Sequence, residues 1–424
     1  MDVDSLATLL TPPGVRAVEA ATDELDAGSD PLRVATEIRR RFDQLPPAIA
    51  AAAISQAQLR RRGRAKFGAA ADLMWFTPEG LEQATRAEVA DHRAMRFARL
   101  YDQLGRQPRI ADLCCGIGSD LRALATAGCD VTGFDRDSLT VDVARANLRA
   151  LAIPAARVEC ADVEALDRSP FDAAFLDPAR RLDGRRTFDV HAYSPPWPYV
   201  AGLLASMPAA VKVAPGIPHE LVPTGVEAEW VSFAGNLKEA VLWSGSLATK
   251  GVSRRATLLP SGATLLPDDV VATTGEPLRY LYEPDDAVVR AHLVAELAGL
   301  VGGRLLDATT AYVTSDRLIA TPFADAFEID HVMAFSLKQL RHELRARTVG
   351  AVTIMKRGSA VDVEKLRRDL RLSGDQHAVV VLALVEGRHQ VLIAHHATAA
   401  LPQPNATAAL PQPNATSALP QPTD

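Results

Sequence analysis

Short apolar strands alternate with amphipathic helices between residues 109 and 180, and this alternation constrains the fold more than any other feature of the chain. The residues predict strands over 110–114, 130–134, 158–160 and 173–176, and helices over 121–127 and 138–151. Further strands are expected over 211–213, 229–233 and 240–243. Strands that alternate with helices form a parallel sheet with helices on its faces, so the sequence predicts a doubly wound α/β fold.

Aspartates lie at or near the ends of the first four predicted strands, at Asp112, Asp135, Asp162 and Asp177. A single such aspartate is more often a helix N-cap than a ligand. Ligands of parallel sheets bind at the carboxyl edge of the strands, so four aspartates in register favour one shared crevice. Gly116 and Gly118 follow the first strand, where glycine lets a ligand approach free backbone N–H groups.

The segment 110–180 resembles class I S-adenosylmethionine-dependent methyltransferases, and the later strands match their seven-stranded Rossmann-like sheet. The resemblance implies a methyltransferase domain over 105–272 with S-adenosylmethionine as its cofactor. It also implies a role for each acid. Asp112 would face the methionyl ammonium, Asp135 the ribose hydroxyls and Asp162 the adenine amino group.

The glycine-rich turn alone is compatible with a second class, the dinucleotide-binding enzymes. The turn reads Gly-Ile-Gly-Ser-Asp over 116–120 and lacks the third glycine of the dinucleotide motif, which favours the methyltransferases. The predicted cofactor-binding set also includes Cys114, which lies in the turn, and Arg136, which follows Asp135.

The predicted catalytic corner is Asp177-Pro178-Ala179-Arg180, directly after the fourth strand. Enzymes that methylate base nitrogens often carry Asn/Asp/Ser-Pro-Pro-aromatic at this place, where the polar side chain holds the amino group and the aromatic ring stacks on the base. This chain keeps Asp177 and Pro178 but has no aromatic residue after them. Arg180 is expected to lie over a base or to hold a phosphate.

Two related motifs lead to different interpretations. Asp-Pro-x-Arg also resembles uracil-C5 methyltransferases, but those enzymes need a cysteine after the next strand, and no cysteine follows Cys160. Ser-Pro-Pro-Trp over 194–197 resembles the catalytic corner of cap-guanosine hypermethylases. It lies seventeen residues after Asp177, so a helix start over 195–205, with serine as N-cap, explains it better.

A mainly helical N-terminal extension is expected over 1–104. Its most basic run, 59–67, is either one solvated helix face or part of a binding surface. The run precedes the aromatic-rich turn 73–80, and together they resemble the N-terminal extension of the cap-hypermethylase-like group. That resemblance implies that Lys66 and Phe76 cover the cofactor.

A small α+β module is expected over 273–396. Its segments 349–358 and 361–370 resemble the THUMP-like domain that follows such methyltransferase cores in actinobacterial and related proteins, and THUMP domains proper bind RNA. The module carries local positive charge at Lys356, Arg357, Lys365, Arg367, Arg368 and Arg371. The remaining residues, 397–424, form a nine-residue Pro-rich repeat that is expected to be disordered.

Charge, apolar runs and cysteine spacing limit where the protein can act and what it can bind. The net charge of −6 argues against a protein that coats nucleic acid non-specifically. No apolar run is long enough for a membrane span, and the start does not have the pattern of a signal peptide. The four cysteines lack the spacing of a zinc site, so a cytoplasmic protein without structural metal is expected.

These observations predict methyl transfer to a base nitrogen of structured RNA, with Asp177, Pro178 and Arg180 at the catalytic corner. Nitrogen methylation needs alignment of a lone pair and a proton acceptor, but no covalent intermediate on the enzyme. Two alternatives stay open. One is methylation of a small metabolite, and the other is a non-catalytic RNA-binding protein that retains the fold.

Overall fold

The computed structural model describes residues 2–179, 181–182, 185–186, 192–357 and 360–397. Their contacts form two compact units, which are described separately below. The first unit comprises residues 1–271 together with 284–296, and the second comprises 272–283 and the chain from 297 onward. The division of the chain into four domains stays a prediction, and the repeat tail lies outside the described residues apart from Ala397.

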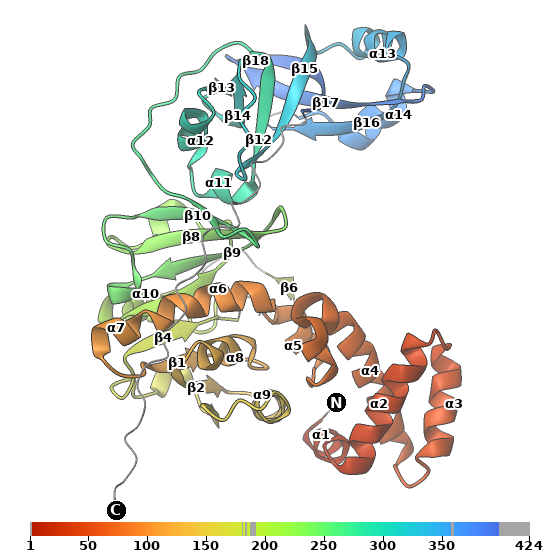
Figure 1. Ribbon diagram of the computed structural model, residues 1–424, viewed down its shortest axis with the longest axis vertical. Helices are drawn as coiled ribbons and strands as arrows, with labels where there is room; N and C mark the ends of the chain where they lie inside the picture. The colour runs from red at the N-terminus through yellow and green to blue at the C-terminus, as the bar shows by residue number, and fades with distance from the viewer. Residues whose placement is uncertain (1, 180, 183–184, 187–191, 358–359, 398–424) are drawn as a thin grey trace, which may run out of the picture. The chain divides into compact units, whose positions relative to one another are not determined.

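In the first unit the described residues form a two-stranded sheet of β5 (Arg181–Leu182) and β6 (Arg185–Arg186) and a nine-stranded sheet (Figure 1). Across the sheet the strands are β11 (Ala263–Leu265), β10 (Arg254–Leu259), β8 (Glu227–Phe233), β9 (Asn236–Trp243), β7 (Ala209–Val213), β4 (Ala173–Leu176), β1 (Arg109–Leu113), β2 (Asp130–Asp135) and β3 (Ala156–Cys160). Five neighbouring strands, β3, β2, β1, β4 and β7, are parallel to one another. β9 runs antiparallel between β7 and β8.

Seven neighbouring strands of this sheet confirm the predicted seven-stranded Rossmann-like sheet. In order across the sheet they are β3, β2, β1, β4, β7, β9 and β8. β10 and β11 extend it beyond the predicted edge, since β10 pairs parallel with β8 and β11 pairs antiparallel with β10. Ala256 and Leu258 of β10 are buried, whereas Arg254 and Arg255 at its start are only partly covered. A strand that begins with two arginines has too short an apolar pattern to be recognised in the sequence.

The helices that follow β1 and β2 are α8 (Ser119–Thr126) and α9 (Ser138–Ala150), where helices were predicted. They share one hydrophobic core with the sheet and with α6 (Ala87–Ala98), which lies before β1. Figure 1 shows α6 running along the sheet from α7 (Leu100–Leu104) toward α5 (Pro78–Gln83). α10 (Trp197–Ser206) packs on β7.

The N-terminal extension is helical, as predicted. Over 1–104 it consists of α1 (Val3–Leu9), α2 (Pro12–Asp26), α3 (Pro31–Arg41), α4 (Pro47–Phe67), a short 3₁₀ helix (Gly68–Asp72), α5, α6 and α7. The buried Asn147 of α9 joins it to the sheet. The side chain of Asn147 accepts a hydrogen bond from Trp75 N–H at 2.6 Å and donates to the carbonyls of Trp75 and Ile117. One amide therefore connects the aromatic turn of the extension to the glycine-rich turn after β1.

The second unit has its own seven-stranded sheet among the described residues, which confirms a small α+β module. Its order is β13 (Arg304–Asp307), β14 (Thr310–Ser315), β12 (Tyr280–Pro284), β15 (Ala324–Ala334), β18 (Arg388–His396), β17 (Gln376–Val385) and β16 (Val349–Lys356). The leucines of α13 (Leu337–Ala346) and α14 (Val363–Leu370) pack together with residues of β16, β17 and β18. No helix in the described ranges is long and apolar enough to cross a membrane.

Candidate active site

The chain between β1 and α8 makes a tight turn with several positive φ angles. Cys114, Gly116 and Gly118 have φ values of 62°, 54° and 88°. Such values suit glycine, whereas residues with a β-carbon rarely adopt them, so Cys114 is held in an uncommon conformation. The N–H of Gly116 donates to Asp135 Oδ2 at 3.1 Å. This bond fixes the turn against the end of β2.

Helix α5 of the N-terminal extension packs directly on this turn. The helix begins at Pro78 with Thr77 as N-cap, whose hydroxyl accepts from Gly80 N–H at 2.9 Å. A β-carbon on Gly80 would lie 2.4 Å from Cγ2 of Ile117, so only glycine allows this close approach. The N-terminal extension therefore forms one wall of the site next to the glycine-rich turn.

A cavity of about 280 Å³ opens where β1, β2 and β4 end. Six of the residues that the sequence analysis selected line it, namely Asp112, Cys114, Gly116, Asp135, Asp177 and Pro178. The segments Thr77–Thr85 of the extension and Cys114–Asp120 of the turn contribute most of the remaining wall. The argument from parallel-strand ends therefore brings Asp112, Asp135 and Asp177 together.

Asp112 is the most unusual group in the cavity. Its side chain is fully buried, and neither carboxylate oxygen has a hydrogen-bond partner in the described structure. Burial raises its pKa well above the ordinary value, the charges of Asp120, Asp177 and Asp135 raise it further, and Arg93 partly opposes them. A buried carboxyl group without a partner is costly, and a bound cation would compensate it.

Asp135 lies at the end of β2 and is held by two backbone N–H groups. Its Oδ2 accepts from Gly116 and its Oδ1 accepts from Asp137, both at 3.1 Å. Each carboxylate oxygen keeps a further lone pair, so the group can still accept hydrogen bonds from ligand hydroxyls. Such a fixed, half-buried carboxylate is suited to a diol.

Cys114 lines the cavity as a neutral thiol. Burial raises its pKa far above the ordinary value, and the neighbouring Asp135 and Asp177 raise it further. Because the thiolate and not the thiol is the nucleophile, Cys114 is unsuited to covalent catalysis at neutral pH. Cys115 is 8% exposed and also lines the cavity, and burial raises its pKa as well.

Lys212 was missed in the sequence analysis. It lies on β7, it is 6% exposed, and its Nζ donates to Asp177 Oδ2 at 2.6 Å and to Thr85 Oγ1 at 3.1 Å. It also lines the cavity. The signal in the sequence was a single lysine inside the apolar strand 209–213, where a charge is kept only when it is paired.

Three of the selected residues, Asp162, Arg136 and Gly118, do not line the cavity. Asp162 is exposed, and its side chain accepts from Glu164 N–H at 3.0 Å as the N-cap of a short 3₁₀ helix. Arg136 is exposed, and neither residue lines the cavity. Arg180 lies outside the described residues. Gly118 is the N-cap of α8.

Lys66 and Phe76 support the cavity wall and do not line the cavity. Phe76 is fully buried, and its ring packs against Phe67 with a centroid distance of 5.8 Å. The ammonium group of Lys66 donates to the carbonyls of Leu81, Glu82 and Ala84 at 2.7–2.8 Å. Lys66 therefore holds the end of α5, whose residues form the wall.

The segment 194–197 lies closer to the catalytic corner than its position in the sequence suggested. Ser194 and Ala179 exchange both backbone hydrogen bonds, at 2.8 and 3.0 Å, as an isolated antiparallel bridge. A helix does start here, as predicted, but its N-cap is Pro196, without a side-chain hydrogen bond. The predicted N-cap role of Ser194 is therefore wrong, because this residue pairs with Ala179.

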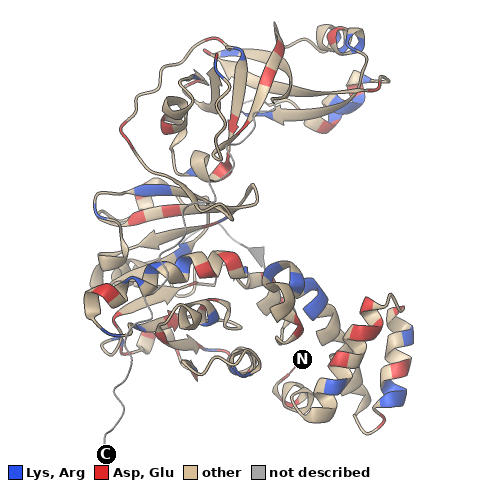
Figure 2. Cartoon of the chain, in the orientation of Figure 1, with Lys and Arg blue, Asp and Glu red and all other residues tan. Residues whose placement is uncertain are grey.

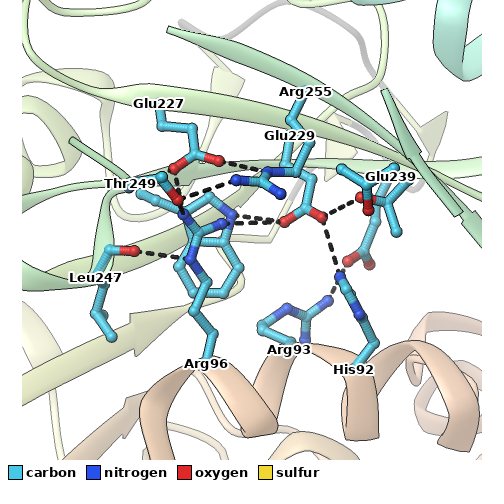
Figure 3. A network of polar contacts seen from close by, with 12 residues as sticks. His92, Arg93, Arg96, Glu227, Glu229, Glu239, Leu247, Thr249 and Arg255 are labelled. Carbon is cyan, nitrogen blue, oxygen red and sulfur yellow. Dashed lines mark hydrogen bonds and ion pairs between the residues drawn. The ribbon is translucent and has the colours of Figure 1, made fainter. Parts of the chain in front are cut away.

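Next to the cavity, which Asp120 lines, charged side chains of α6 contact acids of the sheet (Figure 3). Glu227 and Glu229 of β8 and Glu239 of β9 are at most 2% exposed. Arg93 of α6 pairs with Glu239 and Asp120, while Arg96 of the same helix pairs with Glu227 and Glu229. Each buried carboxylate thus has at least one cation within reach, as the low dielectric of the interior requires.

Glu229 is the most connected member of this network. It accepts hydrogen bonds from His92, Thr257 and the indole of Trp243 at 2.5–3.0 Å. Burial raises its pKa, but His92, Thr257 and Arg96 outweigh that effect and lower the pKa to about 2. Since the folded pKa lies below the unfolded one, this stabilisation is complete above about pH 4.5 and is lost as the pH falls toward 2.

The strand order, the glycine turn after β1 and the acids at the ends of β1, β2 and β4 define a class I methyltransferase fold. Three family models match the chain: a methyltransferase domain at residues 110–181, a THUMP domain-like family at 324–396, and a domain of unknown function at 2–63. Among the described residues no group of three or more His, Cys, Asp or Glu side chains is placed to hold a metal ion.

Relatives of known class extend over most of the chain. An uncharacterized S-adenosylmethionine-dependent methyltransferase of Mycobacterium tuberculosis, from strains CDC 1551 and H37Rv, is 36% identical over 82% of this chain and 95% of its own length. The chain therefore belongs to the S-adenosylmethionine-dependent methyltransferases. The crystal structure of a putative methyltransferase from Porphyromonas gingivalis has the same fold, with a TM-score of 0.67 at 19% identity over 82% of this chain and 91% of that one.

Proposed function

We propose that this enzyme methylates a nitrogen of a base in structured RNA. The observation that carries the proposal is the position of Asp177-Pro178, which lies in the cofactor cavity with the Asp177 carboxylate held by Lys212. Asp177 Oδ1 has no partner among the described residues and can accept an N–H of an acceptor amino group.

The residues of the cavity fit S-adenosylmethionine. The methionyl ammonium provides the cation that the buried Asp112 carboxyl lacks, and Asp135 accepts from the ribose hydroxyls. The cofactor supplies an electrophilic methyl group on a sulfonium. Asp177 orients the acceptor nitrogen so that its lone pair points toward that methyl group. Burial raises the pKa of Cys114 and Cys115, which agrees with methylation that needs no thiolate nucleophile and no covalent step.

RNA as the acceptor is supported by the second unit. The THUMP domain-like match covers 324–396, and Figure 2 shows that Lys and Arg gather on α13 and α14. Two of these arginines are structural, since Arg341 and Arg345 donate to the backbone carbonyls of Asp369 and Arg371. Arg368 and Lys365 lie on α14 itself, where they are exposed and can contact phosphates.

Transfer of tritiated methyl groups to RNA tests the proposal. Total RNA from a strain without the gene is incubated with the purified protein and labelled S-adenosylmethionine, and tRNA and rRNA are then separated. We expect label in one of these fractions, and none with RNA from the parent strain, which is already methylated. If the protein binds S-adenosylmethionine but labels neither fraction, the RNA proposal is wrong and a small-molecule acceptor is favoured.

Lys212→Met should lower kcat about tenfold, because the Asp177 carboxylate loses the ammonium that fixes it. Methionine keeps the length of the side chain without the charge. The Kd for S-adenosylmethionine, measured by calorimetry, should stay within about twofold, and Lys212→Arg should recover part of the activity. A methionine variant with unchanged kcat would show that Lys212 serves stability alone.

We also propose that the enzyme acts in the cytoplasm. All four cysteines are free thiols, and Cys114 and Cys115 lie together at the cavity. Thiols of this kind persist in a reducing compartment. Cell fractionation with an antibody to the protein would test this location.

A further inference from the structure

A second cavity, of about 180 Å³, adjoins the cofactor cavity in the first unit. The two cavities share the segment Glu82–Thr85 and the side chain of Lys212, so a thin wall separates them. Lys212 contacts Asp177 in the first cavity and also lines the second. The second cavity therefore lies next to the group that we assign to the methyl acceptor.

Positive side chains dominate the second cavity. Its charged lining consists of Lys66, Arg86, Lys212, Lys238, Glu82 and Glu239. Glu239 pairs with Arg93 of the buried network, a cation that it shares with Asp120 (Figure 3). Four cations and two carboxylates thus line the cavity, and two of the cations, Lys212 and Arg86, also pair with Asp177 and Glu88.

Two of these cations, Lys212 and Lys238, have N–H groups without a hydrogen-bond partner among the described residues. The ammonium of Lys212 makes two hydrogen bonds, so one of its three N–H groups has no partner among the described residues. Lys238 has no hydrogen bond or ion pair in the described part of the chain, and it is half-buried. By contrast, Lys66 is bound to three carbonyls, and Arg86 pairs with Glu88.

The backbone gives Lys238 an unusual position. In the β8–β9 ladder, Val231 pairs with Glu239 and Ser232 pairs with Leu237, so the register passes over Lys238. Such a bulge leaves one residue unpaired and redirects its side chain, and bulges are common beside active sites. Lys238 stays half-buried without a carboxylate partner, although the desolvation of an ammonium group favours pairing.

We propose that the second cavity binds a phosphate of the RNA backbone beside the nucleotide that is methylated, with Lys238 and Lys212 as its donors. This inference rests on the proposed RNA substrate. Lysine ammonium groups bind phosphate as point charges, and the volume accommodates one such group. The free N–H groups of Lys212 and Lys238 would recognise the phosphate, and the Lys212–Asp177 contact would set the distance from the phosphate site to the acceptor base.

The salt dependence of RNA binding tests the site. Lys238→Gln removes one phosphate contact, so the slope of log Kd against log salt should become shallower by about 0.7–0.9. At 0.1 M salt the Kd for RNA should rise about five- to tenfold, whereas the Kd for S-adenosylmethionine should stay unchanged. Lys250→Gln, which changes an exposed lysine of the same unit outside this cavity, is the matched control.

The outcomes separate this inference from the proposed function. If the wild type binds and methylates RNA but Lys238→Gln keeps its salt slope and Kd, the phosphate site is wrong and the function stands. If the wild type binds S-adenosylmethionine but neither binds nor methylates RNA, both proposals fail. If Lys238→Gln and Lys250→Gln change the slope equally, the effect comes from overall charge, and the phosphate site is again wrong.

Discussion

Replacing Asp112 by asparagine should weaken the binding of S-adenosylmethionine by about 2–3 kcal/mol, or about 30- to 150-fold in Kd. Asp112 is buried without a partner, and asparagine keeps its shape but cannot neutralise the methionyl ammonium. Isothermal titration calorimetry measures the change directly. Asp102→Asn, at an exposed position on α7, is the matched control and should leave Kd unaltered.

The same carboxyl group couples cofactor binding to pH. Burial raises the pKa of Asp112 in the free protein, and an ion pair with the ammonium would favour its ionised form. Binding at neutral pH should therefore release about one proton, which titrations in buffers of different ionisation enthalpy detect. In Asp112→Asn this release should disappear. A wild type that releases no proton would show that Asp112 is already ionised before the cofactor binds.

The raised pKa of Asp112 also makes the stability of the cofactor-free protein depend on pH. The folded pKa of Asp112 is raised, so above about pH 4 the unfolded chain loses a proton that the folded protein keeps. The contribution of Asp112 to the free energy of unfolding therefore falls as the pH rises toward the folded pKa. The Tm of Asp112→Asn, relative to the wild type, should increase between pH 5 and pH 8.

Arg93→Met should destabilise the first unit by about 3–5 kcal/mol. Methionine fills a similar volume but leaves the buried carboxylates of Asp120 and Glu239 without their cation (Figure 3). The contact of the guanidinium with the Phe175 ring, at 4.5 Å from its centroid, is lost as well. Urea unfolding followed by tryptophan fluorescence reports the change, since Trp230 and Trp243 are buried in this unit.

Two further variants show whether charge explains the loss. Arg99→Met changes an exposed arginine at the end of the same helix and should alter stability by less than about 0.5 kcal/mol. Adding Glu239→Gln to Arg93→Met should restore part of the stability, because one of the unpaired charges is removed. If Arg93→Met unfolds at the same urea concentration as the wild type, the network does not stabilise the fold in this way.

The central sheet was predictable because its strands are apolar runs. β1, β4 and β7 contain almost exclusively buried residues, and each is bounded by turn residues or helix starts. Three of the four strand-end acids meet in the cavity because parallel strands end at one edge. Asp162 differs, since β3 is the edge strand and the chain after it turns into a 3₁₀ helix that the side chain caps.

The contacts between distant segments were not predictable from one sequence. Lys212 meets Asp177 across 35 residues, and Arg93 meets Glu239 across 146. The acids of β8 and β9 are visible in the sequence, because glutamates at 227, 229 and 239 lie among apolar strand residues. Such an acid predicts a partner, but only the packing of α6 on the sheet identifies it as Arg93 or Arg96.

The contacts made by Lys66 have a consequence for how this enzyme can evolve. Lys66 holds the end of α5, and α5 and the residues after it form part of the wall of the cavity that we assign to the cofactor. A gene fragment that encodes only the sheet would lack this wall. The N-terminal extension and the catalytic core should therefore be inherited as one module, and exchanging the extension between homologues should require compensating changes around Gly80 and Ile117.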